Sequence, residues 1–116
     1  MAEYLVLIYE DEAAWEDPGA GTAEEMMKGH RLFGERNGAA IRGGNALLAT
    51  STATSLRRDA TGDFVVTDGP FAETKEQLGG YFLVGAGSQD EALAIAAKIP
   101  SARFGGVEVR PIWVMA

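Results

Sequence analysis

The stretch Val66–Val84, VTDGPFAETKEQLGGYFLV, decides the fold because an apolar strand leads into a turn, a charged segment and a second apolar strand. The turn residues are Asp68, Gly69 and Pro70. An aspartate at such a turn can accept backbone N–H bonds two residues on, and the glycine and proline supply the backbone geometry. Bulky side chains over Gly80–Gly85 then face both sides, which predicts a strand.

Before this stretch, the sequence predicts a strand, a helix and further short strands. Tyr4–Tyr9 is an apolar, β-favouring run that is too short for a helix. Thr22–Glu25 matches the capping box, so we expect a helix that runs to about Asn37–Gly38. Its apolar side chains recur at helical spacing and should face the sheet: Met26, Met27, Phe33 and the stem of His30.

Three short strands are expected between this helix and the turn, over Asn45–Ala49, Ser55–Asp59 and Asp63–Thr67. The last two are joined through Ala60–Gly62 in the manner of a hairpin with a glycine in its turn. The first and second could also be one interrupted strand.

A second helix and a last strand are expected after Gly85. Ser88–Glu91 repeats the capping-box pattern, and Pro100 ends the helix. The apolar stripe of this helix is Ala92, Ile95, Ala96 and Ile99. Val107–Val114 is expected to be the last strand, with Pro111 at an edge or a bulge because proline cannot donate a ladder hydrogen bond.

The order β-α-β-β-α-β predicts an α+β fold of the ferredoxin-like, split βαβ kind, with both helices on one face of an antiparallel sheet. The 116 residues fit a single domain, 1–116. One layer of helices leaves the other sheet face uncovered, and its apolar side chains predict a homodimer that packs sheet against sheet.

The chain resembles the DGPF group of the YCII-related proteins. The resemblance rests on the DGPF turn and on three further segments, Tyr4–Tyr9, Thr52–Arg57 and Val107–Ile112. It implies a dimeric α+β barrel. Related proteins carry a histidine and an aspartate suspected of forming a catalytic pair, for which His30 and Asp68 are the matching positions here. Family members are often encoded beside extracytoplasmic-function sigma factors, so the resemblance implies such a factor as a partner.

Composition narrows the classes of partner. A net charge of −7 argues against nucleic-acid binding, because that affinity depends mostly on Lys and Arg. The absence of cysteine excludes disulfides and thiolate metal sites, and it fits a reducing compartment. We see no signal peptide and no apolar run long enough to span a bilayer, so we expect a cytoplasmic protein without a membrane partner.

His30 is the only histidine in the chain and lies on the apolar face of the first predicted helix. A lone histidine there can be a hydrogen-bonded core residue. Alternatively, Asp68 orients its imidazole and prepares it as a general acid or base near neutral pH. Asp68 can also act only as a turn residue, and Phe71 either anchors the turn by packing or forms one wall of a ligand pocket.

Three cations are candidates for holding an anionic ligand: Arg57, Lys75 and Arg110. Alternatively, each of these cations forms only a surface ion pair, which stabilises the fold by at most about 1 kcal/mol. The glycine pairs lack the spacing of a phosphate-binding loop. We expect no metal site, because one histidine and no cysteine leave only Glu10–Glu12, which is better interpreted as a solvated turn.

Two functions follow. The first is a cofactor-free enzyme that acts on a small anionic or carbonyl-bearing organic compound, with His30 transferring a proton and Asp68 orienting it. Dimeric α+β barrels of this type include isomerases and monooxygenases that use no metal or organic cofactor, which is an argument from fold alone. The second is a non-catalytic small-molecule-binding or regulatory protein associated with an extracytoplasmic-function sigma factor.

Overall fold

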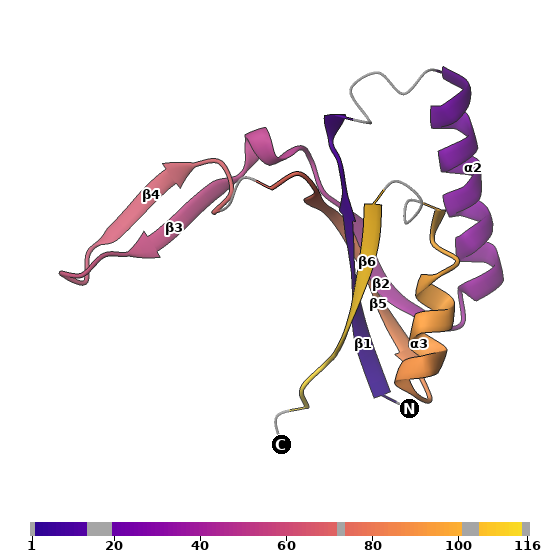
Figure 1. Ribbon diagram of the computed structural model, residues 1–116. Coiled ribbons are helices and arrows are strands. Elements are labelled where there is room, and N and C mark those ends of the chain that lie inside the picture. Colours follow the sequence, from indigo (N-terminus) through magenta and orange to yellow (C-terminus); the bar gives the residue numbers. More distant parts are fainter. Residues whose placement is uncertain (1, 14–19, 72–73, 101–104, 115–116) are drawn as a thin grey trace.

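The computed structural model describes residues 2–13, 20–71, 74–100 and 105–114 (Figure 1). Its helices are α2 (Ala20–Asn37) and α3 (Gln89–Ala96), with a short 3-10 turn, η1, at Thr50–Thr52. Its strands are β1 (Ala2–Glu10), β2 (Ile41–Ala46), β3 (Thr54–Arg58), β4 (Phe64–Asp68), β5 (Gln77–Ala86) and β6 (Gly105–Pro111).

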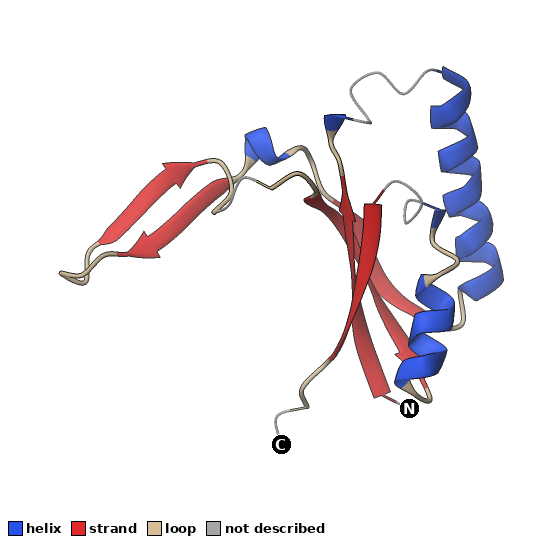
Figure 2. Ribbon diagram, viewed as in Figure 1, coloured by secondary structure: helices blue, strands red, loops and turns tan. Residues whose placement is uncertain are grey.

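Four strands form one antiparallel sheet in the order β2-β5-β1-β6. Strand β5 therefore lies between β1 and β2, and β1 lies between β5 and β6, so each β-α-β unit is split by a strand of the other. The predicted α+β class with an antiparallel sheet is confirmed. Both helices lie on the same side of this sheet, as Figures 1 and 2 show.

The core lies between the sheet and the helices. Tyr4, Val6 and Ile8 alternate along β1 and are buried on the helix side, where Val84 of β5 joins them. Helix α3 contributes Ala92, Ile95 and Ala96 of the predicted stripe, and Ile99, which follows the helix, is buried too. The predicted helix end at Pro100 is wrong, because α3 ends at Ala96. Its N-cap is Ser88, as predicted, whose hydroxyl accepts a hydrogen bond from the backbone N–H of Glu91 at 3.2 Å.

Helix α2 is attached to the sheet mainly through one aromatic side chain. Phe33 is buried, and its ring centroid lies 5.4 Å from that of Phe82 on β5. Among the described side chains of α2 it is the buried one. Met27 was predicted to face the sheet, but two-thirds of its surface is exposed, so that prediction is wrong. Six residues before Phe33, Met27 comes at a different angle around the helix.

Several predicted boundaries shift. Helix α2 begins at Ala20, so Thr22 lies within the helix and is not its N-cap. Strand β2 starts and ends earlier than the predicted Asn45–Ala49, and the last strand stops at Pro111 rather than continuing to Val114. Strand β5 is longer at both ends than Gly80–Gly85.

Strands β3 and β4 form a separate two-stranded sheet, which we call the arm (residues 54–68). The predicted hairpin is confirmed, and its turn contains Gly62 at a φ of +92°, a conformation that glycine adopts without strain. The alternative that β2 and β3 are one interrupted strand is wrong, because η1 separates them and they belong to different sheets. The arm projects from the four-stranded sheet on the side away from the helices (Figure 1).

None of the described helices is both long enough and apolar enough to cross a bilayer.

Candidate functional site

A cavity of about 260 Å³ lies between α2 and the four-stranded sheet, near the end of the sheet from which the arm departs. It combines one imidazole and one carboxylate with apolar and glycine backbone surface. The lining residues are Ile8, Glu10, His30, Gly44, Asn45, Ala46, Gly79, Gly80, Tyr81 and Phe82.

Glu10 reaches the cavity because of the alternation along β1. Tyr4, Val6 and Ile8 face the helices, and a strand repeats its side-chain direction every second residue, so Glu10 faces them too. The opposite strand makes room for it. A β-carbon added at Gly79 would overlap the carboxylate of Glu10, whose Cγ and Cδ would both lie 3.0 Å away. Glycine at position 79 therefore lets Glu10 lie across the strand.

His30 reaches the cavity from α2, one turn before Phe33, which fixes the helix on the sheet. The side chain is neither fully buried nor fully exposed. Burial lowers the pKa of His30 below its ordinary value of 6.5, and the negative charge of Glu10 raises it in part. The imidazole is therefore neutral at neutral pH, which is the form that can accept a proton.

A second hollow of about 500 Å³ shares Glu10, Ala46 and Gly79 with this cavity. Its wall is fixed by Glu12, whose carboxylate accepts hydrogen bonds from the backbone N–H and the hydroxyl of Thr50, at 2.7 and 2.8 Å. These two bonds join the end of β1 to η1. Glu10 thus lies between two hollows, and a ligand larger than the first has adjacent space.

Asn45 and Tyr81 pair across β2 and β5, and the amide of Asn45 donates to the hydroxyl of Tyr81 at 2.9 Å. Tyr81 also pairs with Leu7, so the register places both polar side chains on the sheet face opposite the helices. On the helix side, the acid and base of the cavity are therefore Glu10 and His30.

The other predicted site residues lie elsewhere in the chain. Asp68 ends β4 in the arm, and within one chain the structure does not bring it to His30. The turn that follows is held by Gly69, whose N–H donates to the carbonyl of Ala53 at 2.7 Å and whose φ is +95°. The hydroxyl of Ser55 donates to the carbonyl of Gly69 at 2.6 Å.

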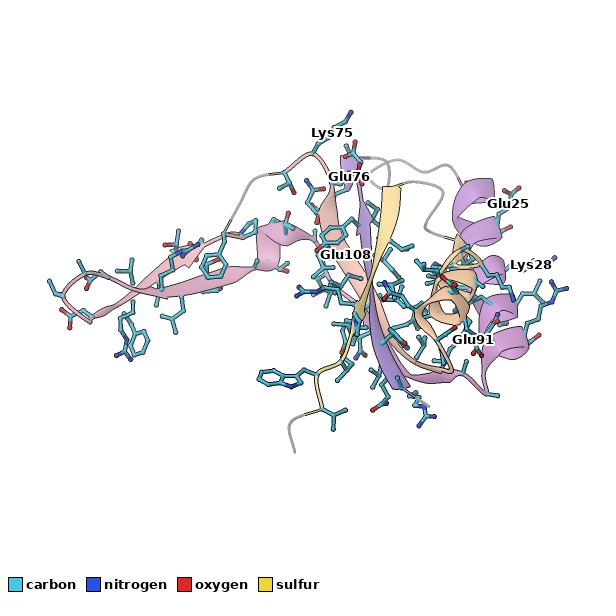
Figure 3. All side chains as sticks on the ribbon, turned by 60° about the horizontal axis from the view of Figure 1, so that its bottom comes forward. Glu25, Lys28, Lys75, Glu76, Glu91 and Glu108 are labelled. Carbon is cyan, nitrogen blue, oxygen red and sulfur yellow. The ribbon has the colours of Figure 1, made fainter. Side chains whose placement is uncertain are left out.

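The predicted ligand-holding cations are also outside the cavity. The guanidinium of Arg57 lies 4.3 Å from the centre of the Phe71 ring, so these two residues interact with each other beside the turn. Lys75 precedes β5 and points away from the body of the protein (Figure 3). Arg110 pairs with Leu5 across β6 and β1, which places it on the sheet face away from the helices.

Sequence reasoning missed Glu10, because the acidic run Glu10–Glu12 was interpreted as a solvated turn. The signal available was the strand period of two, which puts Glu10 on the same face as Ile8 if the strand continues to Glu10. Across the described ranges, no group of three or more His, Cys, Asp or Glu side chains could hold a metal ion.

Comparison with known proteins gives one family and one fold. The model of the YCII-related domain matches residues 2–116. An uncharacterized protein of Rhizobium meliloti (strain 1021) is 38% identical over 115 residues, which cover 94% of this chain and 90% of that protein.

A solved structure has the same fold. It is the 5-chloro-2-hydroxyhydroquinone dehydrochlorinase from Burkholderia phenoliruptrix AC1100, in complex with 2,5-dihydroxybenzoquinone. The TM-score is 0.58 at 15% identity, over 98% of this chain and 95% of that one. At this identity the likeness concerns the fold.

Proposed function

This chain belongs to the YCII-related domain family, and we propose that its cavity beneath α2 binds a small hydroxylated or carbonyl-bearing ring compound and moves a proton on it. The observation that carries the proposal is the meeting of His30 and Glu10 in one cavity. His30 is kept neutral by burial, and Glu10 is placed where it can stabilise the imidazolium.

The proton transfer needs no redox partner. The neutral imidazole of His30 accepts a proton from an O–H group, or from a C–H next to a carbonyl, and the electron pair of the broken bond stays on the ligand. The imidazolium then forms beside the carboxylate of Glu10, which favours the charged form. The proton returns to another atom of the ligand or passes to water.

The cations first expected to hold an anionic group, Arg57, Lys75 and Arg110, do not line the cavity. The volume is slightly below the roughly 300–1,000 Å³ of pockets for drug-sized ligands, so a single ring is the size that fits.

The structural neighbour supports this class of ligand. Its structure holds 2,5-dihydroxybenzoquinone, a small ring compound with hydroxyl and carbonyl groups, and its name describes a dehydrochlorinase. Loss of hydrogen chloride from an organic compound requires a proton to leave, and a neutral histidine in a small cavity can accept it.

The uncovered sheet face supports a homodimer of the α+β barrel kind. Leu5 and Leu7 of β1 pair with Leu83 and Tyr81 of β5, and the strand period of two turns these side chains away from the helix side, where Tyr4, Val6 and Ile8 are buried. The four paired side chains are partly exposed in one chain. Packing two such faces together would remove this apolar surface from water, as in sheet-on-sheet packing.

The experiment uses 2,5-dihydroxybenzoquinone and 2-hydroxyhydroquinone as probes. Their binding is measured by calorimetry, and the exchange of ring hydrogens with deuterium oxide is followed by proton NMR. We expect wild type to bind at least one probe and to accelerate the exchange. His30→Gln should abolish the acceleration, because glutamine cannot take up the proton.

Asp68→Asn is the matched control, since it removes the other candidate for acid/base chemistry. We expect it to change affinity and exchange by less than about twofold, as for a surface substitution. Binding without accelerated exchange would make the chain a binding protein rather than an enzyme. Loss of activity in Asp68→Asn but not in His30→Gln would move the site to the arm.

A further inference from the structure

The arm exposes a continuous apolar face. In its register Leu56 pairs with Val66 and Arg58 with Phe64, so these four side chains share one face of the ribbon. Leu56, Phe64 and Val66 expose 52%, 62% and 65% of their surfaces. The guanidinium of Arg58 lies 4.6 Å from the centre of the Phe64 ring and covers part of it.

A ribbon of this kind is not stable on its own in water. A single two-stranded hairpin is marginal, and three or more strands or a packing partner are needed for independent stability. In the described part of the chain, β3 and β4 pair only with each other. A packing partner for the apolar face would supply the stabilisation that a single hairpin lacks.

The dimensions of one chain support the same conclusion. Its radius of gyration is 16.4 Å, whereas a compact domain of this length has about 13 Å. The extents of 50 × 46 × 18 Å describe a flat body with the arm reaching away from it (Figure 1).

We propose that the apolar face of the arm packs against a second copy of this chain. The inference rests on the homodimer proposed above and assigns it a second contact. The arm projects on the side of the uncovered sheet face (Figure 1), so a two-fold dimer through that face carries each arm past its partner. Each copy then gives and receives one arm.

The exposed apolar area of the arm fits a contact that supplements the sheet interface. The three apolar side chains expose on the order of 300 Å² per copy, less than the roughly 800 Å² per partner of a standard interface, so the arm adds to the sheet contact and does not replace it.

The first experiment compares two neighbouring valines. Val66 lies on the apolar face, whereas Val65 pairs with Arg57 on the opposite face. Because the chain has no cysteine, Val66→Cys and Val65→Cys can each be labelled at one site with a benzophenone maleimide. After irradiation we expect a covalent dimer from position 66 and several-fold less from position 65.

The second experiment measures the dimer dissociation constant by sedimentation equilibrium. Val66→Asp and Leu56→Asp should each raise it by about tenfold or more, and Val65→Asp should leave it within about threefold. Circular dichroism checks that each variant keeps the four-stranded sheet, to which the arm contributes no strand.

The outcomes separate the two proposals. A wild-type dimer that responds equally to Val66→Asp and Val65→Asp, with equal cross-linking from both positions, would overturn the role of the arm and leave the sheet dimer standing. A wild-type chain that is monomeric at all concentrations would overturn both.

Discussion

Phe33 connects the fold to the site, and its truncation gives the sharpest prediction. The side chain is 4% exposed and packs on Phe82, and it is the buried side chain among those described in α2. Phe33→Ala should lower the free energy of unfolding by about 3–5 kcal/mol, of which the aromatic pair accounts for about 0.5–1.5 kcal/mol. The total stability of a domain is about 5–15 kcal/mol, so the variant should be near the limit of folding.

Leu32→Ala is the matched control, because Leu32 is the preceding residue and 42% exposed. Leu32→Ala should lower the free energy of unfolding by less than about 1 kcal/mol. Urea denaturation followed by circular dichroism measures both changes.

Phe33→Ala should also change the pKa of His30 in the cavity. If Phe33 holds α2 on the sheet, then His30 gains water in Phe33→Ala, and its pKa should rise toward 6.5, because burial is the larger of the two influences on it. His30 gives a single set of imidazole signals by NMR, since the chain has one histidine. A loss of stability no greater than that of Leu32→Ala, or an unchanged His30 titration, would refute this account of α2.

Three further predictions concern charge, pH and backbone. Glu10→Gln removes the negative charge that raises the pKa of His30, so the imidazole should titrate at lower pH by NMR; a titration that moves upward would contradict the pairing. The unfolded chain binds a proton at His30 more readily than the folded one, so stability should fall as the pH drops below 6.5 and level off below the folded pKa. His30→Gln should remove this component from urea denaturation curves measured across the range. Gly62→Ala places a β-carbon at a φ of +92° and should cost about 1–2 kcal/mol, whereas Gly34→Ala, in α2 with open space around it, should stabilise by up to about 1 kcal/mol. Equal effects of the two alanines in thermal denaturation would contradict the turn geometry.

The elements that could be predicted from the sequence are those with strong local signals. The central strand β1, the Ser88 cap and the apolar stripe of α3 each follow from a short apolar run, a helical period or a side-chain hydrogen bond within a few residues. The hairpin of the arm was also predicted from its turn. The separation of the arm from the four-stranded sheet was not predicted, because turn chemistry fixes the pairing of two strands but not the sheet to which they belong.

The candidate site was predicted in part for the same reason. His30 was placed on the side of α2 that meets the sheet, and it does line the cavity there. Its partner there is Glu10, whose direction depends on how far β1 continues, and the sequence interpretation ended that strand at Tyr9. The pairing of His30 with Asp68 stays a prediction, since Asp68 lies in the arm and would have to reach His30 from another copy.

A crystal structure of the protein with 2,5-dihydroxybenzoquinone tests the central claim most directly. The account predicts density for the ring in the cavity beneath α2, with one of its oxygens about 3 Å from an imidazole nitrogen of His30. Density for the ring at the turn beside Asp68 and Phe71, with the cavity beneath α2 empty, would contradict it.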